Sequence, residues 1–151
     1  MSRTDSASLV IAAPPGRAFA ALVDRQALES WLPPDGATGR FEHFDLRAGG
    51  SYRLVLTFAD APGKTTADSD VVDVRILEVV DGQHVSQAVE FTSDDPAFAG
   101  TMLMTWQVSP APDGGSLIRI RADDVPPGIS AEDHAEGLES SLRNLAAYLT
   151  R

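Results

Sequence analysis

The chain has 151 residues, with 12 basic and 22 acidic side chains and a formal net charge of −10 at pH 7. An excess of negative charge repels nucleic acid and anionic membrane surfaces, so we expect neither as a partner. The sequence contains no cysteine, which excludes disulfides, thiol catalysis and cysteine-ligated metal centres.

The amino-terminal segment Met1 to Ser6 lacks the apolar stretch of a signal peptide. Nor does any apolar run approach the roughly 20 residues that a membrane-spanning helix needs. We therefore expect a cytoplasmic protein. A chain of this length usually forms one domain, and we expect a single domain over residues 1–151 with an ordered core over about residues 7–150.

The first part of the chain predicts one strand followed by two short helices. The strand covers Ser8 to Ala12, and Pro14-Pro15 then ends it and presets φ for a helix start. A second helix covers Ala27 to Leu32 and ends against Pro33, because a residue before proline avoids the helical region. Three apolar residues of the first helix are expected to face the core: Phe19, Leu22 and Val23.

After Gly36 the pattern becomes that of antiparallel strands joined in hairpins. The predicted strands are Arg40 to Leu46, Ser51 to Phe58, Asp70 to Val80, Gln83 to Thr92, Thr101 to Ser109 and Ser116 to Asp123. Ala48-Gly49-Gly50 predicts a turn, and Asp81-Gly82 suits the two positive φ angles of a type I′ turn. The segment from Pro110 to Gly115 is expected to be a loop.

The chain closes with a long amphipathic helix. Ser130 and Asp133 have the spacing of a capping box at its start. Apolar residues at steps of three and four predict one buried stripe: Ala135, Leu138, Leu142, Leu145 and Leu149. The opposite face is expected to meet solvent, through Glu132, Glu136, Ser140 and Arg143.

This order of elements is typical of an α+β fold in which an antiparallel sheet packs against segregated helices. A strongly twisted sheet tends to curl, and its concave face would leave space against the terminal helix, where ligand cavities commonly measure roughly 300 to 1,000 Å³. The candidate cavity-lining residues are Trp31, Tyr52, Leu54, Leu56, Phe58, Val89, Phe91, Met102, Met104, Trp106, His134, Leu138, Ser141, Leu142 and Leu145. The same residues also suit a dry core, although methionines adapt well to irregular ligands.

Several blocks of sequence together resemble one family. They are Ala13-Pro14 to Phe19, Leu28 to Pro33, Phe44 to Arg53, Phe91 to Met102, and Val125 to Leu149. The chain thereby resembles the activator of Hsp90 ATPase homologue-like branch of the START-like, or SRPBCC (polyketide cyclase), superfamily. The resemblance covers nearly the whole chain and implies a helix-grip fold, in which a curved antiparallel sheet wraps around a long carboxy-terminal helix, with two short helices between strands one and two.

The resemblance implies less about function than about fold, because members of the superfamily carry lipids, bind hormones, cyclise polyketides or hold metals. It implies binding of a hydrophobic small molecule that is lipid, aromatic or polyketide-like, by a monomer or a homodimer. The alternatives are an enzyme of cyclase or dehydratase type using the same cavity, and a co-chaperone-like or regulatory interaction module. The co-chaperone that names the family engages its chaperone through an additional amino-terminal domain, so we do not expect that activity to carry over.

One departure from the family pattern bears on the expected cavity. Many relatives have Gly-Trp in the terminal helix where this chain has Gly137-Leu138. Loss of the large aromatic side chain predicts a larger or more aliphatic cavity.

No catalytic residue, metal site or cofactor site is predicted. The histidines His43, His84 and His134 have no metal-ligand spacing, and His84 is expected to be exposed beside a turn. Alternation places His43 on one side of its strand with Phe41 and Asp45, and the Asp45 carboxylate would orient the imidazole. If Phe44 on the other side is the buried residue, His43 instead faces solvent.

Polar residues at the edge of the leucine stripe are further candidates for ligand contact. His134, Ser141 and Tyr148 are spaced by seven, so they lie on one side of the terminal helix. They either border the cavity or lie half-exposed at the helix boundary. The strand residues Arg53, Glu90, Arg119 and Arg121 are expected to face water on the convex surface.

Overall fold

The structure is a computed structural model that describes residues 3–59 and 69–150. In chain order its elements are β1 (Thr4–Ile11), α1 (Pro15–Val23), α2 (Arg25–Trp31), β2 (Ala37–Phe44), β3 (Ser51–Phe58), β4 (Ser69–Val80), β5 (His84–Phe91), η1 (Pro96–Phe98), β6 (Met102–Pro110), η2 (Pro112–Gly114), β7 (Ser116–Asp123) and α3 (Ala131–Leu149). The predicted order of one strand, two short helices, six strands and a long helix is confirmed.

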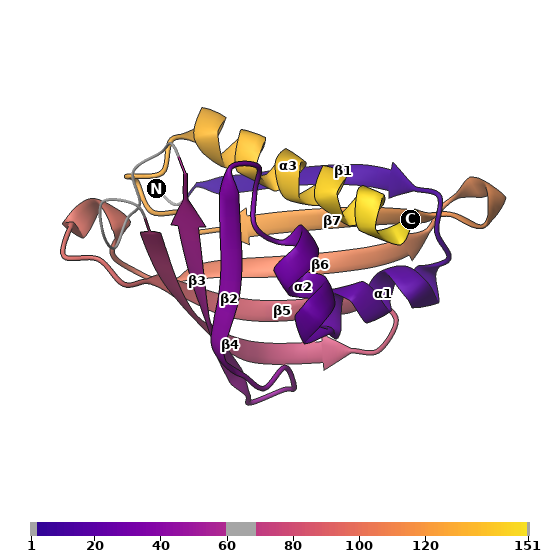
Figure 1. Cartoon of the computed structure of the whole chain (residues 1–151), viewed down its shortest axis with the longest axis horizontal. Coiled ribbons are helices and arrows are strands. Elements are labelled where there is room, and N and C mark those ends of the chain that lie inside the picture. Colours follow the sequence, from indigo (N-terminus) through magenta and orange to yellow (C-terminus); the bar gives the residue numbers. More distant parts are fainter. Residues whose placement is uncertain (1–2, 60–68, 151) are drawn as a thin grey trace.

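The described strands form one antiparallel seven-stranded sheet in the order β1-β7-β6-β5-β4-β3-β2. The first strand pairs with the last, from Thr4 opposite Asp123 to Ile11 opposite Ser116. Figure 1 shows that the sheet curls, so that β2 and β3 stand across the other strands while α3 runs along the same side. Helix α3 contacts β1, α1 and α2. This is the α+β helix-grip fold expected from the sequence.

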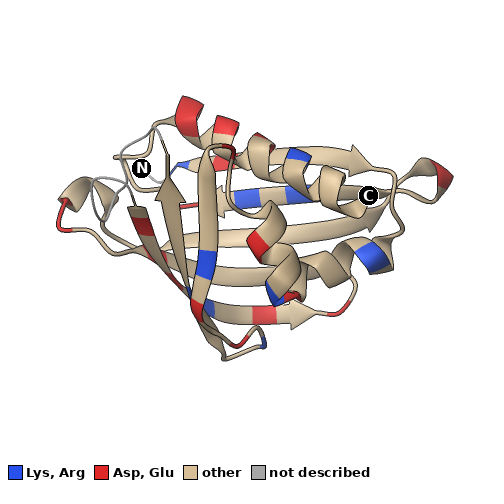
Figure 2. Ribbon diagram, viewed as in Figure 1, with Lys and Arg blue, Asp and Glu red and all other residues tan. Residues whose placement is uncertain are grey.

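The core lies between α3 and the concave face of the sheet. The side-chain oxygen of Ser130 accepts a hydrogen bond from the Asp133 backbone N–H, 3.0 Å away, which caps the start of α3 as predicted. The leucine stripe is buried: Leu138, Leu142, Leu145 and Leu149. On its outer face the helix carries charge, and Figure 2 shows acidic residues gathered toward its amino-terminal end.

The two tryptophans join α2 to the sheet. Trp31 is fully buried, and its ring meets that of Trp106 on β6 edge to face, with centroids 5.6 Å apart. Its Nε1–H donates a hydrogen bond of 2.8 Å to the backbone carbonyl of Ala21 in α1. Trp31 therefore fixes α1, α2 and β6 relative to one another.

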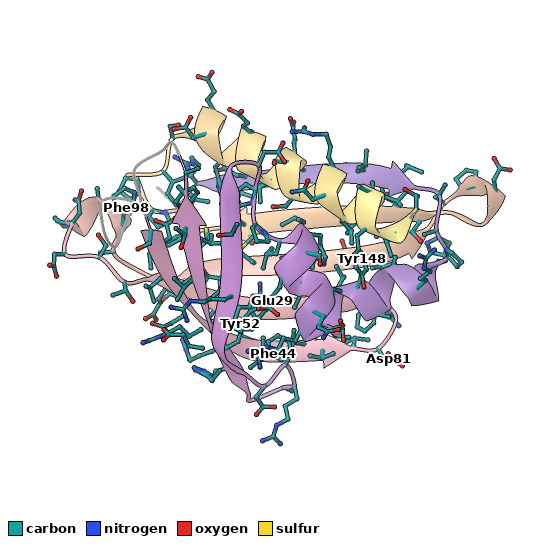
Figure 3. All side chains as sticks on the ribbon, in the orientation of Figure 1. Glu29, Phe44, Tyr52, Asp81, Phe98 and Tyr148 are labelled. Atoms are coloured by element: carbon teal, nitrogen blue, oxygen red, sulfur yellow. The ribbon has the colours of Figure 1, made fainter. Side chains whose placement is uncertain are left out.

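Strand β2 contains an irregularity that changes which side chains face inward. Its register with β3 shifts between Phe41 and His43, so the simple alternation that places these two side chains on one side of the strand is wrong. Phe41 is buried, whereas the exposed His43 contacts the Ser51 hydroxyl at 3.1 Å. Phe44 stacks on Tyr52 with centroids 5.8 Å apart, and both are labelled in Figure 3.

Two further local predictions are wrong. Gly82 has a φ of +74°, but Asp81 keeps a negative φ, and the Gln83 N–H bonds to the Val80 carbonyl at 2.9 Å. This is the pattern of a type II turn rather than type I′. Ser140 is buried rather than wet, because its hydroxyl accepts the Asp35 backbone N–H at 2.8 Å.

The turn between β2 and β3 brings backbone segments very close together. The Gly50 N–H donates to the Arg47 carbonyl at 2.8 Å, and the Gly50 carbonyl accepts from the Ile76 N–H of β4 at 2.9 Å. A Cβ at Gly50 would lie 2.2 Å from the Asp45 carbonyl oxygen. Only a residue without a side chain fits this turn.

Candidate ligand-binding cavity

An apolar cavity of about 140 Å³ lies between the concave face of the sheet and α3. Its lining comes from β3, β4, β5 and β6, the residue after α2 and one residue of α3: Tyr52, Leu54, Leu56, Val72, Val74, Gln87, Val89, Phe91, Met102, Met104, Trp106, Leu32 and His134. We call it the inner cavity. Its volume is below the range expected from the sequence.

A larger recess of about 530 Å³ adjoins it. This outer cavity is lined by Pro34, Asp35, Leu56, Phe58, Asp70, Phe91, Ile129, Asp133, His134, Glu136, Gly137, Ser140, Ser141 and Arg143. Leu56, Phe91 and His134 line both cavities, so the two meet at these side chains. The lining of the outer cavity also includes charged groups, which the inner lining lacks apart from His134: Asp35, Asp70, Asp133, Glu136 and Arg143.

Most of the predicted lining residues surround one of these cavities. The inner cavity contains Tyr52, Leu54, Leu56, Val89, Phe91, Met102, Met104, Trp106 and His134. Phe58 and Ser141 line the outer cavity, where the Ser141 hydroxyl donates to the Leu32 carbonyl at 2.7 Å. Four others are buried in the core and line neither cavity: Trp31, Leu138, Leu142 and Leu145.

The sequence reasoning missed four inner-cavity residues: Leu32, Val72, Val74 and Gln87. Gln87 had a usable signal, because it alternates with Val85 and Val89 and so belongs to the same face of its strand. Val72 and Val74 alternate in the same way on β4. Leu32 follows α2, so its position depends on how that helix docks rather than on strand periodicity.

The wall of the inner cavity contains a polar cluster formed by Tyr52, Gln87 and Trp106. Burial raises the pKa of Tyr52 far above its ordinary value, although a side-chain hydrogen bond with Gln87 acts in the opposite direction. Tyr52 is therefore a neutral phenol at any physiological pH. Within the described chain, Oε1 of Gln87 and Nε1 of Trp106 have no hydrogen-bond partner.

A second polar group lies where the two cavities meet. Nδ1 of His134 is 2.7 Å from Oδ2 of Asp5 in β1, and Arg3 also donates to this carboxylate at 3.0 Å. Because an ionised carboxylate only accepts hydrogen bonds, Nδ1 of His134 carries the proton in this contact. Asp5 thus fixes the orientation of the imidazole that borders both cavities.

The pKa of Asp5 lies below its ordinary value of 3.8. Burial alone would raise it, but the hydrogen bonds and positive charges of His134 and Arg3 favour the ionised carboxylate and outweigh burial. The contribution of Asp5 to stability is therefore complete above its unfolded pKa near 3.9, and is lost as the pH falls through the lower folded value.

An Asp5→Asn variant is expected to unfold with a free energy about 1 to 3 kcal/mol lower than the wild type at pH 7, because Asp5 accepts charge-assisted hydrogen bonds. That difference is expected to shrink as the pH falls below about 4. Urea denaturation at a series of pH values measures it. Asp45→Asn is the matched control, since Asp45 pairs with an arginine two residues away but is exposed. A difference that persists unchanged at pH 2 would contradict an ionic role for Asp5.

Among the described residues, no group of three or more His, Asp or Glu side chains is placed to hold a metal ion. The described helices include none that is long and apolar enough to cross a membrane. The other two histidines lie away from the lining of both cavities. His84 is only half-exposed and contacts the Glu78 side chain.

A curled antiparallel sheet closed by a long terminal helix, with an apolar cavity between them, defines a helix-grip protein. The model of one family, described as activator of Hsp90 ATPase homolog 1-like protein, matches residues 12–150. The chain belongs to this family, which confirms the resemblance found in the sequence. No curated protein matches the chain.

Solved structures have the same fold. A protein of Chromobacterium violaceum is 29% identical with a TM-score of 0.86, over 98% of this chain and 97% of that one. A protein of Mesorhizobium loti is 22% identical with a TM-score of 0.76, over 99% and 98% of the two chains. DynU16, from the dynemicin biosynthetic locus, is 17% identical with a TM-score of 0.70, over 97% of this chain and 47% of that one.

Proposed function

We propose that this protein binds a hydrophobic small molecule in the space between the sheet and α3. The observation that carries the proposal is the inner cavity, whose wall is almost entirely apolar and which adjoins a larger recess at Leu56, Phe91 and His134. Unfilled apolar space in a core costs free energy, so a ligand that fills it stabilises the folded protein. Membership of a family with a ligand-binding fold supports the same conclusion.

The chemistry of the wall favours a molecule that is apolar over most of its surface. Met102 and Met104 present flexible thioethers that repack around irregular shapes. Aromatic side chains from three strands, Tyr52, Phe91 and Trp106, supply flat faces against which a ring can stack. A lipid, an aromatic compound or a polyketide-like molecule meets these requirements.

A thermal-shift screen against fatty acids, sterols, flavonoids and aromatic polyketides tests the proposal. A ligand present at 100 times its dissociation constant stabilises the folded state by about 2.7 kcal/mol. For a chain of this size that corresponds to a rise in melting temperature of roughly 5 to 10 °C. We expect such a rise from one chemical class.

Two neighbouring residues of β6 provide matched variants for this screen. Met104 lines the inner cavity, whereas Leu103 is 40% exposed. Met104→Trp is expected to fill the inner cavity and abolish the ligand-dependent rise, while Leu103→Trp keeps it. If both variants retain the rise, the ligand binds elsewhere, and if no compound in the library shifts the melting temperature, the binding function is rejected.

A second candidate function is an enzyme of cyclase or dehydratase type that uses the same cavities. One observation favours it: Asp5 orients His134 through Nδ1, which leaves Nε2 free of that contact beside both cavities. A histidine held in this way by a carboxylate can act as a general base. Product analysis of any ligand found in the screen tests this candidate, because it requires conversion of the ligand.

A further inference from the structure

Two buried polar atoms in the inner cavity, Oε1 of Gln87 and Nε1 of Trp106, are unpaired within the part of the chain that the structure describes. Both residues are 1% exposed, and both line the cavity. Most buried polar groups in folded proteins are paired, and leaving one unpaired costs about 1 to 3 kcal/mol. An unpaired donor and an unpaired acceptor in one wall therefore point to a partner that enters the cavity.

The pairing of β5 with β6 brings these two groups to the same region of the wall. Gln87 lies opposite Met104, and Trp106 lies opposite Val85, so Gln87 and Trp106 are diagonal neighbours. Such neighbours lie about 7 to 8 Å apart, with their Cβ atoms somewhat closer, which is within reach of long side chains. The indole N–H can only donate and the amide oxygen can only accept. One hydroxyl group, which both accepts and donates, complements the pair.

The Gln87 side chain also forms a hydrogen bond with the side chain of Tyr52. The side-chain hydrogen bond with Gln87 acts to lower the pKa of Tyr52, as expected when an amide N–H donates to the phenol oxygen. The amide orientation is thereby set by a neighbour in the wall. Oε1 of Gln87 is the part left for a ligand.

Size and charge restrict what can enter. The inner cavity of about 140 Å³ is close to the size of an apolar cavity of about 150 Å³ that holds benzene. Its described lining contains no Lys, Arg, Asp or Glu. His134 in this lining is already paired with Asp5, so a carboxylate or an ammonium group there would lose its hydration without gaining a free counter-ion. The buried end of the ligand is therefore neutral and about one ring wide.

We infer that the inner cavity binds the ring-sized head of a ligand through a neutral hydroxyl group, which accepts from Nε1–H of Trp106 and donates to Oε1 of Gln87. The inference rests on the proposed function and names the chemistry of its ligand, a phenol or a comparable ring alcohol. The remainder of a longer ligand extends past His134 into the outer cavity.

Three probes of similar shape test the inference: para-propylphenol, para-propyltoluene and para-propylbenzoate. Isothermal titration calorimetry is expected to give at least about fivefold tighter binding of the phenol than of the toluene, as the loss of two net hydrogen bonds predicts. The nearly isosteric Gln87→Leu variant keeps the Trp106 donor but leaves the buried hydroxyl hydrogen without an acceptor, and this penalty is expected to reduce the preference to within about twofold. Thermal unfolding verifies that the Gln87→Leu variant folds. If it does not fold, the Trp106→Phe variant, which lacks the indole N–H donor, is used in its place.

The two tryptophans supply an independent readout with an internal control. In a ¹H–¹⁵N spectrum, the phenol is expected to move the indole N–H signal that Trp106→Phe removes. The signal of Trp31 is expected to stay in place, because its N–H is already bonded to the Ala21 carbonyl.

The possible outcomes separate the inference from the proposed function. Equal affinities for the phenol and the toluene, or tightest binding of the benzoate, overturn the hydroxyl contact and leave the binding function standing. If none of the three probes binds but a compound of the thermal-shift library does, the hydroxyl contact is overturned and the binding function stands. If neither the three probes nor any library compound binds, both the hydroxyl contact and the binding function are rejected.

Discussion

Replacing Trp31 by alanine is expected to lower the free energy of unfolding by about 3 to 5 kcal/mol, the usual cost of truncating a large buried aromatic side chain. The change removes the edge-to-face contact with Trp106 and leaves the Ala21 carbonyl without its donor. Urea denaturation measures the free energy directly. The melting temperature is expected to fall by roughly 6 to 20 °C.

Trp31→Phe is the control for this variant, because it keeps a ring in the core and removes only the indole N–H. Its expected cost is about 1 to 3 kcal/mol, that of one unpaired buried carbonyl. If Trp31→Ala loses no more stability than Trp31→Phe, the ring does not tie α1 and α2 to the sheet as the structure indicates.

Replacing Gly50 by alanine is expected to lower the free energy of unfolding by at least about 3 kcal/mol, more than ordinary overpacking. The new methyl group would lie 2.2 Å from the Asp45 carbonyl oxygen and 3.1 Å from that of Arg47. Both are backbone atoms, so relief requires the turn itself to open. Opening would break the bond of 2.9 Å between the Ile76 N–H and the Gly50 carbonyl.

The preceding residue supplies the matched control. Gly49 has a φ of +84° and open space where a Cβ would lie, so Gly49→Ala meets backbone strain of about 1 to 2 kcal/mol without a clash. Urea denaturation of the two variants side by side separates strain from collision. Equal losses would mean that the turn relaxes around the new side chain at position 50 at little cost.

Features set by local sequence were predictable. The cap at Ser130, the leucine spacing of α3 and the turn at Gly49-Gly50 each follow from residues within a few positions of one another. Strand alternation likewise placed Tyr52 and Trp106 on faces that line one cavity. Each of these patterns depends on residues that are close together in the chain, so a single sequence is enough to predict the structure that it forms.

Features set by tertiary contacts were not predictable. β1 begins at Thr4 rather than at the predicted Ser8, because its first residues are ordered by pairing with β7 and carry little apolar alternation of their own. Ser140 turns inward because the Asp35 backbone requires an acceptor. The volume of the inner cavity depends on how the side chains of four strands meet, which no periodicity encodes.

The pairing of the first strand with the last affects how the protein folds during its synthesis. Thr4 and Asp123, whose side chains are bonded at 2.7 Å, are separated by 119 positions in the chain. At about 5 to 20 residues per second, β1 therefore waits roughly 6 to 24 seconds on the ribosome before its partner has been synthesised. Until then β6 lacks its neighbour β7, and α3 is not yet available to cover the concave face. During that interval the nascent chain exposes an unpaired strand edge and the apolar concave face of its sheet. Both promote aggregation, so this is the stage at which binding by a chaperone would protect the chain most.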